Sequence, residues 1–150
     1  MYLGFYPSQC TLKNQITFPT LFRKSVGKKL LITFWFDNSL MVVPLEKGSE
    51  VLDNLIANSS ELLPEVRDLE RFFYSNAAEV ELDGQNRFVI PKHLKDYAGI
   101  KRKTVFVGVK ERIELWDEEQ WSNYGKIREL QIKQTARRLY EEIVKGGVTK

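Results

Sequence analysis

An internal repeat constrains the fold of this chain more than any other feature of its sequence. Two segments, TLKNQITFPTLFRKSVG at residues 11–27 and DGQNRFVIPKHLKDYAG at residues 83–99, align at an offset of 72 residues. The second segment repeats the asparagine, proline and glycine of the first, pairing Asn14, Pro19 and Gly27 with Asn86, Pro91 and Gly99. The chain is therefore expected to contain two copies of one small unit.

Both copies continue with the same order of strand and turn signals. Runs rich in β-branched and aromatic residues cover 30–36 and 40–43 in the first copy, and 104–109 and 113–116 in the second. Pro19 and Pro91 each end a strand and suit the start of a helical turn, where no amide donor is needed. Each copy thus predicts a strand, a turn, a second strand, a short helix and a hairpin.

Helical patterns separate and follow the two copies. They cover residues 45–57 and 64–74, with Asn58, Ser59 and Ser60 marking a break, and then the long charged segment 118–144 with its sparse apolar residues. The expected fold class is α+β. The expected organisation is a first module at 1–60, a linking helix at 61–76, a second module at 77–124 and a charged C-terminal helix or tail at 125–150.

Composition excludes several classes of protein. No run approaches the roughly 20 apolar residues of a membrane helix, and the start MYLGFYPSQC lacks the pattern of a secretory signal. Cys10 is the only cysteine and His93 the only histidine, which argues against an intramolecular disulfide and the usual zinc sites. We expect a cytoplasmic protein with no membrane partner, metal, cofactor or small-molecule substrate.

Basic residues are concentrated toward the two ends of the chain. Residues 1–50 hold six basic and three acidic residues, residues 51–100 five and nine, and residues 101–150 twelve and eight. Such clusters of lysine and arginine can neutralise the phosphates of a polyanion. Ordinary solvated surface charge explains the same distribution, so charge alone leaves both interpretations open.

The second copy and its surroundings carry a resemblance to a known family. The run RFFYSNAAEVELD at 71–83, followed by GQNRFVIPKHLKDYAGI and VFVGVKERIELWDEEQW, resembles the second half of the MraZ proteins, which belong to the AbrB/SpoVT-like superfamily. The matching residues are Asp83, Arg87, Pro91, Gly99, Gly108, Trp116 and Asp117. The resemblance covers about residues 1–124 and is strongest from Arg71 onward, so the C-terminal helix has no clear counterpart in it.

This resemblance implies a fold and a function. The fold would be two tandem swapped-hairpin β modules forming a double-psi-like barrel, with flanking helices and a C-terminal helix. The function would be a sequence-specific, nucleoid-associated transcriptional regulator that binds direct repeats in promoter DNA upstream of its own gene. It would repress its own operon of division and cell-wall genes and assemble into a homo-oligomeric ring.

The resemblance also assigns residues to DNA binding. In AbrB-like proteins the turn between the first two strands presents an arginine to DNA, which is Arg87 in the second copy and is replaced by Gln15 in the first. Basic residues near the matched motif suit phosphate contacts: Lys13, Arg23, Lys24, Lys92 and Lys95. The alternative for Arg87 is a salt bridge with Asp83 that holds the turn, and plain surface exposure is the alternative for the five other cations.

Two departures from the family pattern affect the turns. Asn86 stands where the family has glycine, at a position expected to need a positive φ, which asparagine tolerates. In the first copy, the acid, glycine and arginine of the family are replaced by Thr11, Asn14 and Gln15. We expect both turns to form, with Asp83, Asn86, Thr11 and Asn14 in structural roles, but the first turn to lack charged chemistry.

Two rival functions remain open at this stage. Glu79, Glu81 and Asp83 would share one face of a strand and suggest metal-assisted hydrolysis, but they lack a nucleophile or base, so no catalytic residue is assigned. The other rival is a ring-forming, partner-binding protein with weakened DNA affinity. The aromatic residues Phe72, Phe73, Tyr74, Trp116 and Trp121 are expected in core packing rather than in stacking on bases.

Overall fold

The computed structural model describes residues 1–56 and 61–147. By its internal contacts the chain divides into two compact units, residues 1–118 and residues 119–150. Both copies of the repeat lie in the first unit. The break expected at Asn58, Ser59 and Ser60, and with it the end of the first predicted module, lies outside the described residues.

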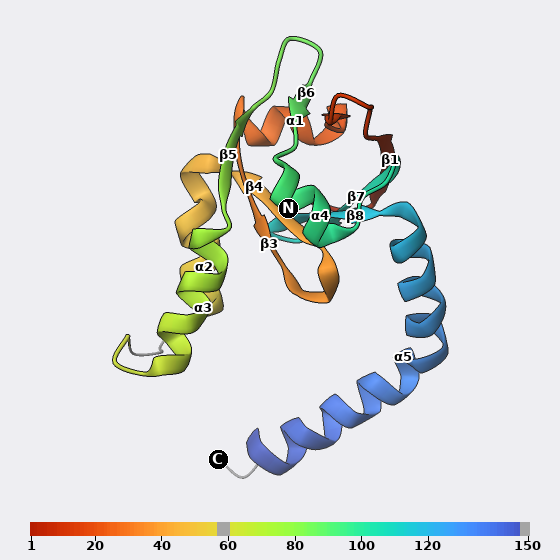
Figure 1. The fold of residues 1–150 in the computed structure, drawn as a ribbon. Coiled ribbons are helices and arrows are strands. Elements are labelled where there is room, and N and C mark those ends of the chain that lie inside the picture. The colour runs from red at the N-terminus through yellow and green to blue at the C-terminus, as the bar shows by residue number, and fades with distance from the viewer. Residues whose placement is uncertain (57–60, 148–150) are drawn as a thin grey trace. The chain divides into compact units, whose positions relative to one another are not determined.

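The two copies contain the same elements in the same order (Figure 1). The first copy comprises β1 (Phe5–Gln9), β2 (Gln15–Thr17), α1 (Thr20–Val26), β3 (Lys29–Phe34) and β4 (Leu40–Pro44). The second comprises β5 (Ala78–Glu81), β6 (Arg87–Val89), α4 (Lys92–Ala98), β7 (Lys103–Val109) and β8 (Arg112–Asp117). The order of strand, turn, strand, short helix and hairpin predicted from the repeat is confirmed.

The remaining helices lie within the first hairpin or after one of the two hairpins. The 3-10 turn η1 (Phe36–Asn38) joins β3 to β4, and η2 (Leu45–Lys47), α2 (Gly48–Leu55) and α3 (Pro64–Ser75) come before β5. The helix α5 (Glu118–Gly147) follows β8. Pro64 occupies the start of α3, where its missing amide hydrogen costs no hydrogen bond. The helices expected near 64–74 and 118–144 are confirmed.

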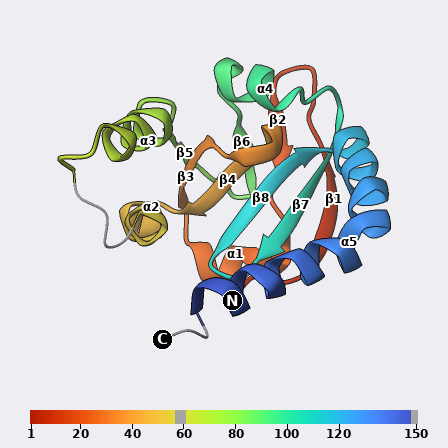
Figure 2. The ribbon, with the colours of Figure 1, turned by 90° about the horizontal axis from the view of Figure 1, so that it is seen from below.

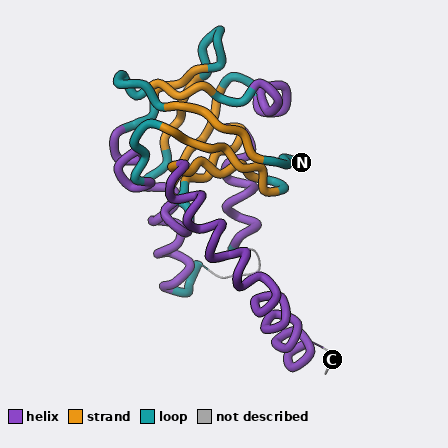
Figure 3. The backbone as a smooth tube through the Cα atoms, turned by 90° about the vertical axis from the view of Figure 1, so that its right-hand side faces the viewer, coloured by secondary structure: helices purple, strands orange, loops and turns teal. Residues whose placement is uncertain are grey.

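Across residues 1–56 and 61–147 all strand pairs are antiparallel, and they form two sheets. The larger sheet has six strands in the order β1-β7-β8-β4-β3-β5, and β2 and β6 form a two-stranded ribbon. The strands gather into one block, joined by loops at its edges (Figure 3). The six-stranded order stays open at β1 and β5, so the described residues show an α+β fold without the closed barrel that the resemblance implied.

Most strand pairs join one copy of the repeat to the other. In the described residues β1 pairs with β7, β5 with β3, β4 with β8 and β2 with β6, while the hairpins β3–β4 and β7–β8 each stay within one copy (Figure 2). The first strand of each copy therefore completes the hairpin of the other. Neither copy can satisfy the backbone hydrogen bonds of its strands alone.

The main hydrophobic core is built from equivalent positions of the two copies. The apolar residues that match in the repeat are all buried, with at most 4% of any of them exposed: Ile16, Phe18 and Phe22, and their counterparts Phe88, Ile90 and Leu94. Phe18 packs edge-on against Phe106 of β7, with ring centroids 5.3 Å apart. The sequence similarity of the copies therefore reflects one shared core.

A second core cluster joins the sheet to the helices between the copies. Trp35, Met41 and Val43 pack with Leu52 of α2 and Phe73 of α3, and Figure 2 shows both helices on the side of β3 and β4. Trp35 is therefore a core residue, as are Phe73 and Trp116, whose expected core packing is confirmed. Tyr74, by contrast, is 40% exposed.

The second unit is described by α5. Within it the Arg128 guanidinium lies over the Trp121 ring at 5.0 Å. Several large apolar side chains of this helix are exposed, among them Leu130, Leu139 and Ile143. In the part of the chain that the structure describes, no helix combines the length and the apolar character needed to cross a membrane.

Candidate nucleic-acid interface

The β2–β6 ribbon has one buried face and one outward face. Ile16 pairs with Phe88, and both are buried in the main core. Because side chains alternate along a strand, their neighbours point the other way. Gln15 pairs with Val89 and Thr17 with Arg87, so these four side chains make up the outward face. Thr17 and Val89 are exposed, and Gln15 and Arg87 are half-buried.

The turn before β6 is held by the Asp83 carboxylate. Its Oδ1 accepts hydrogen bonds from the amides of Gln85, at 2.8 Å, and Arg87, at 2.9 Å. The Asn86 amide donates to the Asp83 carbonyl at 3.0 Å. Asn86 has φ +60°, the left-handed conformation that asparagine adopts more readily than most residues. Asparagine can therefore occupy this position in place of the family's glycine.

Arg87 forms the ion pair with Asp83 that was expected as the alternative to DNA contact. Its Nε donates to Asp83 Oδ2 at 3.1 Å, and 41% of the Arg87 side chain is exposed. A guanidinium has five N–H donors, so this bond orients the group while leaving its terminal nitrogens outside the bond. The amides of Arg87 and Gln85, together with the guanidinium, hold the pKa of Asp83 below its ordinary value.

The turn before β2 has the same shape without a carboxylate. Thr11 Oγ1 accepts from the amides of Gln15, at 3.1 Å, and Lys13, at 3.3 Å. The Asn14 amide donates to the Thr11 carbonyl at 2.9 Å, and Asn14 has φ +62°. A hydroxyl thus replaces the acid of the second copy. The expectation that the first turn forms despite its substitutions is confirmed.

Each turn is attached to the opposite copy by its asparagine. The carbonyl of Asn86 accepts from the Phe18 amide at 2.7 Å, and the carbonyl of Asn14 accepts from the Ile90 amide at 2.8 Å. The side chains repeat this exchange: Arg23 Nε donates to Asn86 Oδ1 at 3.0 Å, and Lys95 Nζ to Asn14 Oδ1 at 2.8 Å. Arg23 and Lys95, which the sequence suggested as phosphate contacts, therefore bind the turns themselves.

The other suggested cations are on the surface around the ribbon. Lys13 lies in the first turn and is exposed, as is Lys24 on α1. Lys92 on α4 is 83% exposed and forms an ion pair with Asp96 at 2.6 Å. These three side chains can reach a polyanion without losing a buried contact.

Sequence reasoning missed two exposed basic residues beside the turns. The carbonyl of Lys28 accepts from the Leu82 amide at 2.8 Å, and that of Arg102 from the Cys10 amide at 2.6 Å. Each therefore lies next to the residue that precedes a turn of the other copy. A hollow of about 440 Å³ beside the first turn is lined by Thr11 and Leu12 together with Lys95, Lys101 and Arg102. Basic residues shortly after the closing glycine of both copies were the available signal.

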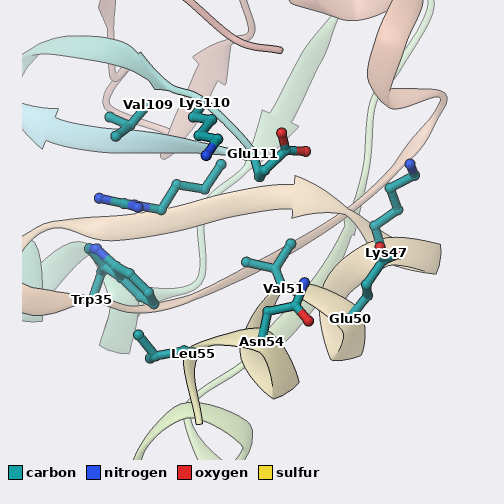
Figure 4. Close-up of a pocket in the computed structure, with 10 residues that line it drawn as sticks. Trp35, Lys47, Glu50, Val51, Asn54, Leu55, Val109, Lys110 and Glu111 are labelled. Atoms are coloured by element: carbon teal, nitrogen blue, oxygen red, sulfur yellow. The ribbon is translucent and has the colours of Figure 1, made fainter. Parts of the chain in front are cut away.

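A separate groove lies between α2 and the β7–β8 hairpin (Figure 4). Its volume is about 370 Å³, and Trp35, Val51 and Leu55 form its apolar part. The Arg112 guanidinium lies over the Trp35 ring at 4.9 Å and pairs with Glu114 at 2.8 Å. The rim carries both signs of charge, so it offers no uniform field for a polyanion.

The acidic residues considered for metal-assisted hydrolysis do not form a metal site. Glu79 pairs with Lys29 at 3.6 Å, and Asp83 is engaged by the turn amides and Arg87. Among residues 1–56 and 61–147, no group of three or more histidine, cysteine or acidic side chains is arranged to hold a metal ion.

Comparison with known proteins identifies the family. A profile described as "MraZ protein, putative antitoxin-like" matches residues 73–142. A protein of Syntrophomonas wolfei named transcriptional regulator MraZ is 34% identical over 148 residues, covering 99% of this chain and 97% of the relative. One of Clostridium beijerinckii with the same name is 38% identical over 126 residues, covering 84% and 88%.

These matches also correct one expectation. The resemblance seen in the sequence ended near residue 124, but the family profile continues to residue 142 and so includes most of α5. The long helix is therefore part of what the chain shares with its relatives. The chain belongs to the MraZ family, a family of transcriptional regulators and not of enzymes.

Proposed function

We propose that this chain is a transcriptional regulator that binds double-stranded promoter DNA through the outward face of the β2–β6 ribbon. The observation that carries the proposal is the position of Arg87. Its guanidinium is partly exposed, oriented by Asp83 and set on a ribbon whose other face is fixed in the core. A rigid platform of this kind keeps a side chain in one orientation for recognition.

The two ends of the ribbon suit different contacts. Arginine forms paired hydrogen bonds with a guanine edge or a phosphate, whereas glutamine pairs best with adenine. Arg87 and Gln15 occupy equivalent positions of the two copies, so one chain presents an unlike pair of side chains to DNA. We therefore expect each subunit to recognise a site that is not palindromic.

Surface cations around the ribbon would add affinity without reading sequence. The exposed residues in this group are Lys13, Lys24, Lys28, Lys92 and Arg102. Contacts of lysine and arginine with phosphates release counterions, and each contact that is removed lowers the salt slope by roughly 0.9. These residues set the strength and position of binding rather than its specificity.

The proposal extends to the cellular role implied by the family resemblance. The regulator would act in the cytoplasm at the nucleoid, binding direct repeats upstream of its own gene and repressing its division and cell-wall operon. A homo-oligomeric ring would place several copies of the ribbon on successive repeats, so that weak individual contacts add through effective concentration. Such avidity would compensate for the uncharged Gln15.

The test is a titration of labelled DNA from upstream of the gene, followed by fluorescence anisotropy at several salt concentrations. The wild-type protein should prefer this fragment to a shuffled one. Arg87→Ala should lose most of that preference, because one good bidentate base contact contributes about 1–3 kcal/mol. Arg71→Ala is the matched control, since Arg71 is exposed on α3 and pairs with Asp68. Undiminished preference in Arg87→Ala would remove Arg87 from recognition.

A second candidate function is a ring-forming, partner-binding protein whose DNA affinity has weakened. The replacement of the family's acid, glycine and arginine by the uncharged Thr11, Asn14 and Gln15 favours it. It predicts rings in solution together with DNA binding that shows no sequence preference even at low salt. Specific binding of the upstream fragment would exclude it as the main function.

A further inference from the structure

We propose that Arg23 and Lys95 are positioning residues that hold the DNA-facing turn of the opposite copy, and that Arg23 thereby sets the orientation of Arg87. This inference rests on the proposed function where it concerns DNA, but the positioning itself can be tested without DNA.

The contacts obey the 72-residue offset of the repeat. Arg23 is one of two basic residues in the last turn of α1, and Lys95 is the basic residue in the last turn of α4. Each donates to the side-chain oxygen of the asparagine in the other copy's turn, at 3.0 Å and 2.8 Å. Both cations are half-buried. Two different basic residues thus make the same contact at symmetry-related places, which indicates a structural requirement there.

The Arg23 guanidinium is used twice by the protein. Nε binds Asn86 Oδ1, and Nη1 donates to the Gly27 carbonyl at 2.8 Å, at the end of α1. The side chain therefore links the C-terminal end of its own helix to the turn of the other copy. A guanidinium engaged in this way has fewer donors left for a phosphate than an exposed lysine such as Lys24.

Asn86 transmits this link to the recognition side chain. It immediately precedes Arg87 and is held at positive φ. Its carbonyl accepts from Phe18 at 2.7 Å, while its side chain accepts from Arg23. The backbone carbonyl and the side-chain oxygen of Asn86 are therefore both held by residues of the first copy. Glycine, which the resemblance places here, has no side chain to accept such a bond, so the link depends on the side chain of Asn86.

The two links serve unlike turns. Arg23 holds the turn that carries Arg87, and Lys95 holds the turn that carries the uncharged Gln15. Replacing either cation by glutamine removes one positive charge. If the cations act by position, Arg23→Gln should impair recognition much more than Lys95→Gln. If both bind phosphate, the two variants should lose similar affinity.

The experiment measures Kd for the upstream fragment across a salt series in a double-mutant cycle. Arg23→Gln and Asn86→Gly, a substitution that leaves the net charge unchanged, should each weaken specific binding. We expect a loss of about tenfold in each, the usual scale of coupling between residues in contact. The double variant should be no weaker than either alone, and the salt slope should stay that of the wild type. Arg23→Lys should retain binding, because Lys95 already makes this contact.

Two results would overturn the role in DNA recognition. One is a salt slope that falls by about 0.9 in Arg23→Gln, together with an equal loss of affinity when Arg23→Gln is made in the Asn86→Gly background. That result would identify Arg23 as a phosphate contact. The other is an equal loss of affinity in Lys95→Gln and Arg23→Gln.

A readout without DNA separates this inference from the proposed function. Amide hydrogen exchange of residues 83–89 should accelerate in Arg23→Gln, and that of residues 11–17 in Lys95→Gln, because each turn loses its link. Unchanged exchange in both variants would overturn the positioning role. Accelerated exchange in a protein that shows no specific DNA binding would leave the positioning intact and refute the proposed function.

Discussion

The first residue of each turn shows how two different side chains hold the same backbone shape. Thr11 and Asp83 each accept hydrogen bonds from the backbone amides two and four residues later in the chain. Thr11 accepts them through its hydroxyl and Asp83 through its carboxylate. The positive φ expected for Asn86 is also observed. The partners of Arg23 and Lys95 could not be predicted, because they lie 63 and 81 residues away in the other copy.

A substitution at Asp83 should reveal the carboxylate through pH. Asp83→Thr copies the first turn and removes the titrating group. The pKa of Asp83 is lowered in the folded protein, so its charge stabilises the fold above the ordinary pKa of 3.8, and this stability is lost as the pH falls through the lowered value. Urea midpoints of wild type and variant should therefore differ at pH 7 and converge in acid. A difference independent of pH would contradict this account.

A substitution at Gln15 should restore charge to the first turn. Gln15→Arg adds a cation at the position equivalent to Arg87, so we expect tighter DNA binding and a salt slope larger by roughly 0.9. Anisotropy titrations over a salt series measure both quantities. Ser49→Arg, an exposed change on α2, adds the same single positive charge and is the control for added net charge alone. Equal gains in the two variants would show that Gln15 lies away from the DNA.

At the scale of elements, β2 and β6 illustrate what the repeat can and cannot predict. The sequence placed Ile16 and Phe88 among the apolar matches of the repeat, and both are buried. It could not show that these two strands pair with each other, since strand partners far apart in the chain are fixed by tertiary packing. The reciprocal pairing explains why the repeat conserves this pattern in both copies.

The two faces of the ribbon should respond differently to truncation. Phe88→Ala should lower the free energy of unfolding by about 3–5 kcal/mol, because it leaves a cavity in the main core. Its neighbour Val89 is 56% exposed, so Val89→Ala should change stability by only about 0.5 kcal/mol. Urea unfolding measures both. A large loss in Val89→Ala would mean that this face is covered rather than available to DNA.

At the scale of the molecule, the exchange of strands makes the two copies depend on each other. The repeat predicted two units, but it could not predict that four of the described strand pairings run between them. The closed barrel implied by the resemblance is absent from the described strands, because their order ends at β1 and β5. Sequence similarity therefore predicted which elements the two copies share, but it did not predict whether the strands close into a barrel.

The two copies should therefore unfold together. Native-state hydrogen exchange should give the same opening free energy for the slowest amides of β3 in the first copy and β7 in the second. The reason is that β3 pairs with β5 and β7 with β1, so opening either hairpin breaks pairs with the other copy. A clearly lower opening free energy in one copy would contradict this interdependence.

The central claim is that the outward face of the ribbon meets DNA, and protection of a single thiol tests it most directly. Val89 lies on that face and is 56% exposed, so Val89→Cys places the thiol there. Leu63, just before α3, is 51% exposed, so Leu63→Cys is a control of similar exposure. The native Cys10 is buried and should react slowly with a maleimide. With saturating upstream DNA, alkylation should slow strongly in Val89→Cys and stay unchanged in Leu63→Cys. Equal rates with and without bound DNA in Val89→Cys would contradict the account.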